Sequence, residues 1–527
     1  MKVKWGNLFI FLLIIGGVVG YFQWERIQGL IDEKLTTQRT TSVAPSKDAV
    51  IYARDTWITG SIPELGLLRG YDRDFELELS QSFYGSDHER LVALGEGKAH
   101  FSEMSWPSLI RNLEKVENGK YADQVVVLAF IDFSRGGDGV IVQQGIKTVN
   151  DLINKRVGYF DDGTSKYMLS FLLRMVDMRL EDVKGVPYDD EAKLQQDFVS
   201  GKLDAIAYWQ PGMSEVLKNK PGSSVLLSTA DMPTLIPDVL IANRAYVAKN
   251  PEKAEAFLKF WFATVKHIQE RPELAYDRWA EALNKATYTE GGKEEPIYGT
   301  DFDAAAVKEI FTNEIRLVGF EENLKLMGIS QKSELDQMIK FAVENWRRIE
   351  KINGPSEQIA FNGTLAAIKD DVTLKVGAID PSKSGAAVPV AERPKEFQPN
   401  ADATKLNEVA QMAIPNIEFA PDATAITPAG KKVINEVLVP LMKQFPNFYL
   451  LIDGHTDVGG DVGFLTRLSL GRAESVKREL MALGFPEAQL IVRGFGDTKP
   501  LFPNPKNAEE KAKNRRTEFR LLREPTR

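Results

Sequence analysis

The sequence predicts a protein of the α/β class in three parts: an N-terminal transmembrane helix, a long two-lobed region, and a smaller α+β unit with a mixed sheet. Three observations lead to this prediction. An apolar run near the N-terminus follows two lysines, strands and helices then alternate over a long stretch, and a proline-rich segment precedes a last group of strands and helices. The expected units are an anchor (1–27), a tether (28–47), the two-lobed domain (48–376), a linker (377–402) and the last domain (403–527).

Composition excludes several classes of function. The 527 residues carry a formal net charge of −8 and contain no basic run suited to nucleic acid. The chain has no cysteine, which excludes disulfides, cysteine-ligated zinc, cysteine nucleophiles and an acylated lipoprotein anchor. Its 4 histidines are scattered along the sequence, so we expect neither a histidine metal site nor a cofactor.

The N-terminal segment has the features of a membrane anchor. Lys2 and Lys4 precede an apolar run at 8–22, and the stretch from Trp5 to Trp24 would span about 30 Å as a helix. Because the positive end stays in the cytoplasm, we expect a single-pass inner-membrane protein with most of the chain in the periplasm. A cleaved signal peptide is the alternative, but no A-x-A site follows Gly20.

The long region alternates buried-type strands with helices. Strands are expected at Val125–Phe130, Asp138–Val142, Arg156–Tyr159 and Leu203–Trp209, and Pro251 opens a strongly helical stretch. A turn at 163–165 lies between the third strand and a helix. Thr164 and Ser165 are suited to cap that helix, and its free N–H groups would attract an anion. The alternative is that this cap serves only its own helix.

This region resembles the periplasmic solute-binding proteins of nitrate, sulfonate and taurine transporters. The resemblance rests on ordered segments at 139–142, 147–152, 155–158, 163–165, 180–183, 198–205 and 209–211. It implies two α/β lobes that close on a small anion. It gives as solute-binding candidates Thr59, Ser61, Ser102, Thr164, Ser165 and Trp209. No nucleophile–base pair stands out in this region, so we do not expect an enzyme or catalytic residues.

The last domain is expected to contain strands at Ile417–Phe419, Phe448–Ile452, Leu490–Arg493 and Thr517–Leu522, and a helix from Pro428 to about Gln444 capped by Thr427. Strand 448–452 leads into a turn that presents Asp457. The next helix carries Arg472 beside an apolar stripe of Leu465, Leu468, Val476, Leu480 and Leu483. A carboxylate and a guanidinium facing one pocket suit a zwitterion, such as an amino acid with both ends free.

Four ordered motifs in this domain resemble the OmpA-like peptidoglycan-binding domain. They are Gly454-His455-Thr456-Asp457, the 468–473 segment LSLGRA, Gly494-Phe495-Gly496 and Asn514-Arg515-Arg516. The resemblance implies that Asp457 and Arg472 grip the diaminopimelate of the stem peptide. It gives a supporting role to Gly454, His455, Thr456, Asn514, Arg515 and Arg516. Leu465 stands where the family usually has asparagine.

Together these features predict a membrane-anchored periplasmic solute-binding protein that recognises a small anion and also binds peptidoglycan. One alternative is the substrate receptor of a nitrate/sulfonate/taurine-type ABC transporter, with a permease as partner. A second is a cell-envelope scaffold or sensor with no transported ligand. An enzyme is the third and least favoured.

Overall fold

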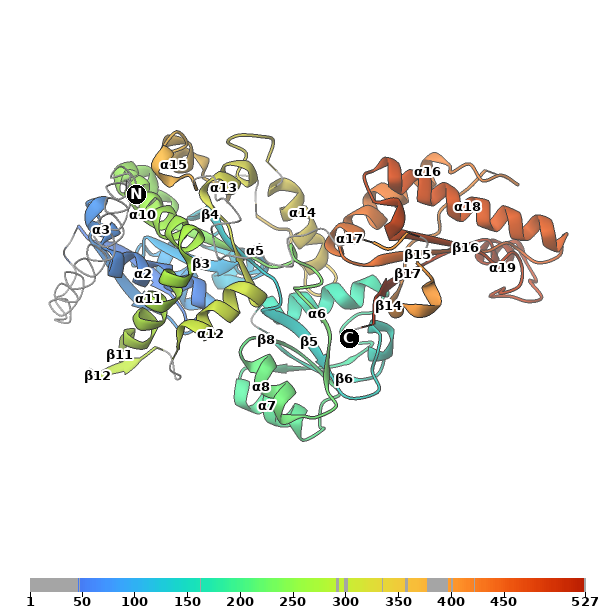
Figure 1. Cartoon of the computed structure of the whole chain (residues 1–527), viewed down its shortest axis with the longest axis horizontal. Coiled ribbons are helices and arrows are strands. Elements are labelled where there is room, and N and C mark those ends of the chain that lie inside the picture. Colours follow the sequence, from blue (N-terminus) through green and yellow to red (C-terminus); the bar gives the residue numbers. More distant parts are fainter. Residues whose placement is uncertain are drawn as a thin grey trace, which may run out of the picture.

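The computed structural model describes residue 46 and residues 48–525, apart from 162, 291–292, 298–301, 334, 356–358, 377–396, 400 and 421. The described chain forms two lobes and a C-terminal domain (Figure 1). Among the described helices, none is long and apolar enough to cross a membrane. The predicted anchor, nearly all of the tether and most of the predicted linker lie outside the described residues.

Lobe 1 is built on a six-stranded mixed sheet with the order β13-β4-β10-β3-β1-β2. Strand β1 runs parallel to β2 and β3, whereas β10 runs antiparallel to β3 and β4. The strands are β1 (Val50–Arg54), β2 (Leu79–Phe83), β3 (Phe101–Ser105), β4 (Val125–Ser134), β10 (Pro237–Asn243) and β13 (Ile315–Leu317).

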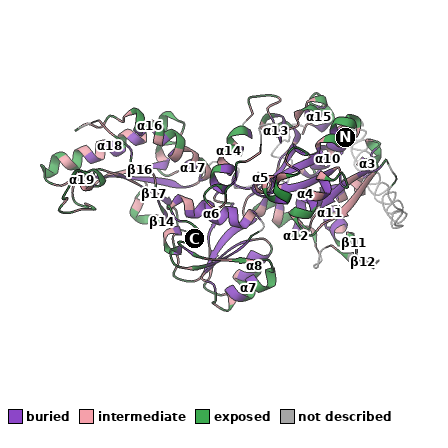
Figure 2. Cartoon of the chain, turned by 180° about the vertical axis from the view of Figure 1, so that it is seen from behind, coloured by how far each residue is buried: buried purple, intermediate pink, exposed green. Residues whose placement is uncertain are grey.

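Helices cover both faces of this sheet (Figure 1). They are α2 (Ile62–Arg69), α3 (Tyr71–Asp74), α4 (Asp87–Gly95), α5 (Trp106–Lys115), α9 (Arg244–Lys249), α10 (Pro251–Glu270), α11 (Pro272–Lys285), α12 (Ala304–Glu309), α13 (Phe320–Leu326), α14 (Leu335–Trp346) and α15 (Asn362–Ala367). A two-stranded hairpin, β11 (Thr287–Glu290) and β12 (Lys293–Pro296), extends beyond α11. The sheet is buried between these helices, as Figure 2 shows.

Lobe 2 contains a five-stranded sheet with the order β7-β6-β8-β5-β9. Its strands are β5 (Asp138–Val142), β6 (Arg156–Phe160), β7 (Lys184–Tyr188), β8 (Ala205–Trp209) and β9 (Ser224–Ser228), and its helices are α6 (Thr164–Met175), α7 (Glu191–Val199) and α8 (Gly212–Asn219). The two-lobed prediction is therefore confirmed. Strand β5 has the predicted bounds, whereas β4 continues from the expected end at Phe130 to Ser134.

The chain passes between the lobes twice, from β4 into β5 and from β9 back into β10. All ten residues of β4 and all seven of β10 are buried, because these strands lie at the centre of lobe 1. Hydrogen bonds join the two crossings. The hydroxyls of Ser134 and Thr229 lie 2.8 Å apart, and the Thr229 N–H donates to the Asp138 carbonyl at 2.8 Å.

The segment that follows β13 also bridges the lobes. Helix α14 packs against α5 of lobe 1 and α6 of lobe 2. The indole N–H of Trp346 donates to the Pro107 carbonyl at 3.0 Å. Beyond the helix, Glu350 accepts from Arg111 Nε at 3.1 Å and from Lys166 Nζ at 2.7 Å, so one carboxylate holds a residue of each lobe.

The C-terminal domain has a four-stranded sheet with the order β14-β17-β15-β16. Its elements are β14 (Asn407–Met412), α16 (Pro428–Val433), α17 (Val439–Gln444), β15 (Tyr449–Gly454), α18 (Val462–Ala482), β16 (Leu490–Gly494), α19 (Ala508–Asn514) and β17 (Thr517–Arg523). The β15–β16 pair is parallel and the other two pairs are antiparallel, which confirms the mixed sheet.

Two details of this domain differ from the sequence prediction. The expected strand at 417–419 forms only one isolated bridge, between Phe419 and Ile426, and the first strand of the sheet is β14 instead. Leu483 is 41% exposed, so the apolar stripe of α18 ends at Leu480. The Thr427 cap is confirmed, because its side chain accepts from the Gly430 N–H.

The C-terminal domain contacts lobe 2 through α6. The Ala413 N–H donates to the Met175 carbonyl at 2.7 Å, and the Phe445 ring stacks on Phe171 with centroids 6.1 Å apart. At the edge of the contact, the Gln411 N–H donates to Asn150 Oδ1 at 2.9 Å. Lobe 2 and the C-terminal domain therefore share an apolar contact framed by backbone hydrogen bonds.

Candidate functional site

A cavity of 690 Å³ lies where the two lobes meet, next to the crossings of the chain. Lobe 1 lines it from the ends of β1 and β3, from β10 and from α4 and α5. Lobe 2 lines it from the ends of β6, β7 and β8 and from the start of α6. Clefts between domains are the usual place for small-molecule sites, so this cavity is the candidate solute site.

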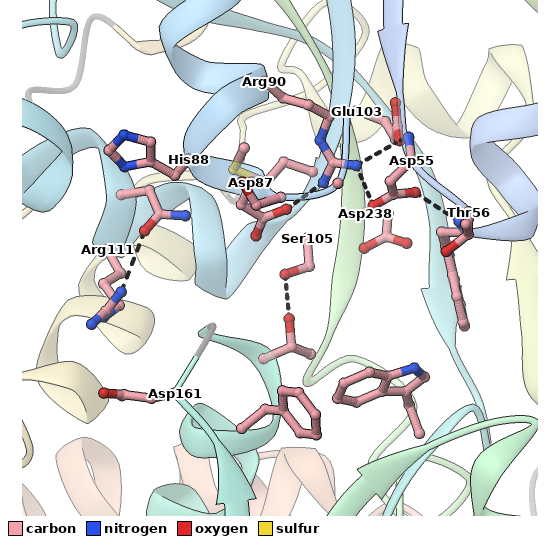
Figure 3. Close-up of a pocket in the computed structure, with 18 of the residues that line it drawn as sticks. Asp55, Thr56, Asp87, His88, Arg90, Glu103, Ser105, Arg111, Asp161 and Asp238 are labelled. Atoms are coloured by element: carbon pink, nitrogen blue, oxygen red, sulfur yellow. Dashed lines mark hydrogen bonds and ion pairs between the residues drawn. The ribbon is translucent and has the colours of Figure 1, made fainter. Parts of the chain in front are cut away.

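A buried arginine organises the lobe 1 wall. Arg90 is 2% exposed and forms ion pairs with Asp55, Asp87 and Glu103 (Figure 3). Glu103 also accepts from the Tyr52 hydroxyl at 2.8 Å. Three carboxylates surround one guanidinium, so the Arg90 charge is already satisfied within the protein and the cluster keeps an excess of negative charge.

A second group of acids lies on the crossing strands. In the antiparallel register of β4 and β10, Asp132 stands directly opposite Asp238, which places both side chains on one face. Asp132 is fully buried, and neither of its carboxylate oxygens has a hydrogen-bond partner among the described residues. Asp138 opens β5 and accepts from the Ser134 hydroxyl at 2.6 Å. The crossings therefore carry three buried acids.

Burial changes the titration of these acids. It raises the pKa of Asp132 to about 7, of Asp138 to about 6 and of Glu103 to about 7, in each case as the largest effect. Burial, followed by the charges of Asp132 and Asp138, raises the pKa of Asp238 well above its usual range. Asp55 differs. Burial is the largest single effect on its pKa, but the charge and hydrogen bond of Arg90, together with the Trp57 N–H, outweigh it and lower the pKa. Burial thus favours the protonated form of Asp132, Asp138, Glu103 and Asp238.

The starts of two helices meet at the edge of the cavity. The Thr164 hydroxyl at the start of α6 lies 2.7 Å from the Ser105 hydroxyl, which caps α5. Gly163 has φ +132°, and a Cβ there would lie 2.4 Å from Ser108 Oγ. The α6 end is therefore packed closely against lobe 1, and only a glycine fits at this contact.

The six predicted solute-binding residues occupy different positions. Thr164 and Trp209 line the cavity, whereas the other four do not. Ser61 is buried and accepts from the Trp279 indole at 2.7 Å, and the Ser102 hydroxyl donates to the Glu103 carbonyl. Thr59 is buried beside Asp132.

Ser165 bonds the backbone of Phe160 and does not cap α6. The N-cap of that helix is Gly163, without a side-chain cap bond, which corrects the predicted capping role of Thr164 and Ser165. The serine hydroxyl instead closes the turn between β6 and α6. It supports the shape of the cleft from behind.

The acids of the cleft are not among the site residues predicted from the sequence. A signal for them was present, because Asp132 and Asp238 each interrupt an otherwise apolar strand: VVVLAFIDFS in β4 and PDVLIAN in β10. An acid in a fully buried strand is costly to retain, which marks it for attention. That Asp132 and Asp238 face each other depends on the register of β4 and β10, which cannot be predicted from the local sequence.

In the C-terminal domain, the turn after β15 holds Asp457 in a fixed orientation. The Asn514 side chain donates to Asp457 Oδ1 at 3.1 Å, and Asn514 is itself held by the backbone of Phe502. Arg515 Nη1 lies 3.9 Å from Asp457 Oδ2. The predicted motif at 514–516 thus positions the predicted turn carboxylate.

Arg472 reaches the same region from α18. It is 8% exposed, its Nε donates to the Ala423 carbonyl at 3.0 Å, and its guanidinium lies 5.2 Å from the Phe419 ring centroid. Burial, followed by the charge of Arg515, lowers its pKa. Among the described residues no side chain accepts from its two terminal nitrogens, so a planar fork is available for a carboxylate.

The remaining motif residues hold this turn against α18. A Cβ on Gly454 would lie 2.1 Å from the Ser469 carbonyl oxygen, so only glycine allows the strand to approach the helix. His455 is buried against the Phe495 ring, and the Thr456 N–H donates to the Gly496 carbonyl at 2.9 Å. Arg516 pairs with Glu518 at 2.6 Å.

The fold and these two sites define a two-lobed binding protein joined to an α+β domain with a charged recognition turn. Comparison with protein families agrees with each part. Residues 68–275 match the NMT1/THI5-like family, and residues 418–515 match the OmpA family. The chain therefore fuses an NMT1/THI5-like domain to a C-terminal OmpA family domain, which confirms the predicted fusion.

Individual relatives match one part each. A binding protein of Brucella abortus (strain 2308) is 25% identical over 249 residues, which are 46% of this chain and 75% of the relative. The peptidoglycan-binding protein ArfA of Mycobacterium tuberculosis (strain CDC 1551 / Oshkosh) is 34% identical over 103 residues, 20% of this chain and 31% of ArfA. The solved structure of the periplasmic aliphatic sulphonate binding protein SsuA from Escherichia coli has 17% identity and a TM-score of 0.43, covering 58% of this chain and 91% of SsuA. The names of the Brucella and Mycobacterium relatives refer to binding.

The raised pKa of Asp132 predicts a pH-dependent gain in stability from Asp132→Asn. The folded parent binds a proton that the unfolded chain releases between about pH 4 and pH 7, so Asp132 destabilises the fold increasingly as pH rises through this window. We expect the variant's free energy of unfolding to rise relative to the parent, by at most about 1.4 kcal/mol per pH unit. Urea denaturation of the full chain at pH 5, 6, 7 and 8 measures the difference.

The variant must be compared with the parent at each pH, because other groups change the stability of the chain with pH in the opposite direction. Burial lowers the pKa of His100 and of His267 to about 4, which increases stability as pH rises over part of the same range. Asp123→Asn, which removes an exposed carboxylate outside the cavity, is the control and should show a constant difference from the parent. An equally constant difference for Asp132→Asn would contradict the assigned burial effect.

Proposed function

We propose that the two-lobed domain captures a small solute in the cleft. The observation that carries the proposal is the cavity between the lobes, lined by charged, aromatic and hydroxyl side chains from both. Closure of two lobes around a ligand is a common motion in proteins built this way. The relative from Brucella abortus is named a binding protein, which supports the same reading.

The sequence also predicts that the solute is a small anion. The starts of α5 and α6 at the cavity edge favour an anion, because helix N-termini attract negative charge. The carboxylates around the cavity oppose it, because a like charge in a buried site costs several kcal/mol. The balance of charge therefore weighs against the anion.

We propose further that the C-terminal domain binds peptidoglycan through Asp457 and Arg472. An oriented carboxylate and a guanidinium with free terminal nitrogens suit the amine and the carboxylate of a diaminopimelate side chain. The OmpA family match supports this function, and ArfA, which is similar over this domain, is named a peptidoglycan-binding protein.

The proposed setting is the cell envelope, with residues 5–24 as an inner-membrane anchor and the rest of the chain in the periplasm. A receptor for an ABC permease is one use of such a protein, and the NMT1/THI5-like match favours it. A scaffold or sensor without transport is the alternative. A permease gene adjacent to the gene for this chain would favour the receptor.

Solute capture is tested with the full chain purified without denaturation. We expect a small molecule to be released on heating and to be identified by mass spectrometry. Trp209→Ala, which removes an aromatic wall of the cavity, should retain at least tenfold less of it. None of the described tryptophans is exposed, so no matched tryptophan outside the cavity is available as a control. Tyr188→Phe, which keeps a ring at the cavity, is the control instead. Absence of any released molecule, together with no response to added metabolites, would contradict capture.

Peptidoglycan binding is tested by co-sedimentation of the full chain with isolated sacculi. Asp457→Asn and Arg472→Lys should each remove most of the bound fraction, because one loses the charge and the other the bidentate fork. The double variant should bind little less than either single variant, since both residues contact one ligand. Leu465→Asn should increase binding if the amide found in the family contacts the peptide.

Arg467→Lys is the matched control, because Arg467 is an exposed arginine on the same helix. Arg472→Ala is a poorer test, since it also removes the bond to Ala423 and the contact with Phe419, at a cost of about 1–2 kcal/mol. Folded Asp457 and Arg472 variants that sediment as well as the parent would rule out the proposed grip.

The topology is tested with a reporter fused after Arg527. A reporter that works only outside the cytoplasm should be active, and the intact mass of the protein should include residues 1–20. Activity of a cytoplasmic reporter would contradict the proposed orientation. A mature N-terminus close to Tyr21 would replace the anchor with a cleaved signal peptide.

A further inference from the structure

We propose that the inner end of the cleft binds the protonated nitrogen of a small organic cation, with the Asp238 carboxylate as its main partner. This inference rests on the proposed solute capture and specifies the class of solute. It concerns the part of the cavity beside β3, β4 and β10, where Figure 3 shows Asp238 next to Asp55 and the Arg90 cluster.

Acidic side chains predominate among the titratable residues that line the cavity. Eight acids contribute to the lining and only three residues that are always basic. The basic residues are already paired: Arg90 with Asp55, Asp87 and Glu103, and both Arg111 and Lys115 with Glu350. An anionic solute would therefore find no free guanidinium or ammonium along the inner wall of the described cavity.

Among the buried acids that line the cavity, Asp238 is the one whose side chain lacks a partner within the described residues. It is 7% exposed and lines the cavity, and its side chain takes part in no hydrogen bond or ion pair with the described residues. Its neighbour across the β-ladder is Asp132, so two acids face each other where an opposite charge would be favourable. A buried carboxylate without a partner is costly, and a bound cation would remove that cost.

The other cavity walls indicate an organic cation instead of a metal ion. Among the described residues, no group of three or more acidic or histidine side chains is arranged to hold a metal. Trp57, Phe160 and Trp209 line the same cavity, and the Phe160 and Trp209 rings meet edge to face with centroids 4.9 Å apart. Aromatic faces attract cations and cover the flat or apolar body of a ligand.

The titration of the site provides a second signature. In the free protein, burial raises the pKa of Asp238 well above its usual range and that of Asp138 to about 6. A bound cation stabilises the ionised carboxylates, so binding near pH 6 should release protons. A bound anion would favour the protonated carboxyls and should take protons up.

The experiment compares three probes of the same shape and different charge: benzamidine, benzamide and benzoate. Putrescine and ethanesulfonate are added as an aliphatic cation and anion. Binding to the full chain is measured by titration calorimetry at pH 6 in two buffers with different ionisation heats. We expect a cation to bind at least tenfold more tightly than its neutral or anionic counterpart and to release protons.

Asp238→Asn keeps the side-chain shape and removes the charge. It should weaken binding of the cation at least tenfold. It should also raise the melting temperature of the probe-free chain, because burial keeps the Asp238 carboxyl protonated in the folded chain while the unfolded chain ionises it, and the variant removes this penalty. Asp123→Asn, at an exposed position outside the cavity, should leave both quantities unchanged. The rise in melting temperature shows that lost binding in the Asp238 variant does not reflect unfolding.

The outcomes separate this inference from the function on which it rests. Binding of benzoate or ethanesulfonate in preference to the cations would overturn the cation assignment and leave solute capture intact. Cation binding that is unaffected by Asp238→Asn would overturn the assigned site. If none of the five probes binds and no molecule is released from the purified chain, solute capture and the cation assignment both fail.

Discussion

The two crossings between the lobes are the constraint on which the rest of the structure depends. Strands β4 and β10 pair at the centre of lobe 1; β4 leads into β5 of lobe 2, and β10 receives the chain that returns from β9. The bonds among Ser134, Asp138 and Thr229 tie the crossings to one another. Because Ser134, Asp138 and Asp238 line the cavity and lie on or next to these strands, the crossings fix the place of the inner cleft and supply two of its acids.

That charge is an energetic liability within an otherwise well-packed domain. Arg90 neutralises only part of the acid cluster, and neither Asp132 nor Asp238, which face each other across the ladder, forms an ion pair with a described residue. Buried groups without partners cost stability, and proteins tend to keep them where a ligand or a reaction uses them. The acids of the cleft thus destabilise lobe 1, and the apolar strands around the cleft supply the stability that compensates for them.

Much of the fold could be predicted from the sequence, because it follows from local patterns. Apolar strands such as Asp138–Val142 and the ordered motifs at 454–457 and 514–516 are signals contained in adjacent residues. The cleft chemistry was less predictable, because it depends on register and packing. Nothing local indicates that Asp132 faces Asp238, that Ser61 bonds Trp279 in the core, or that Arg472 is largely buried on Phe419. In each case the partner is distant in sequence, and the strand pairing or helix packing decides the contact.

Helix α6 connects the two candidate sites. Its first residue, Thr164, meets Ser105 at the cavity, and its last, Met175, accepts a hydrogen bond from Ala413 of the C-terminal domain. Phe171, in the middle of the helix, packs on Phe445 of that domain. A twelve-residue helix behaves as a rigid element, so a lobe movement that displaces α6 from α5 must either carry the C-terminal domain with it or break this contact. An anchored C-terminal domain would therefore resist such a movement through the Phe171–Phe445 contact. Solute binding in the cleft would supply the free energy that drives the movement against this resistance.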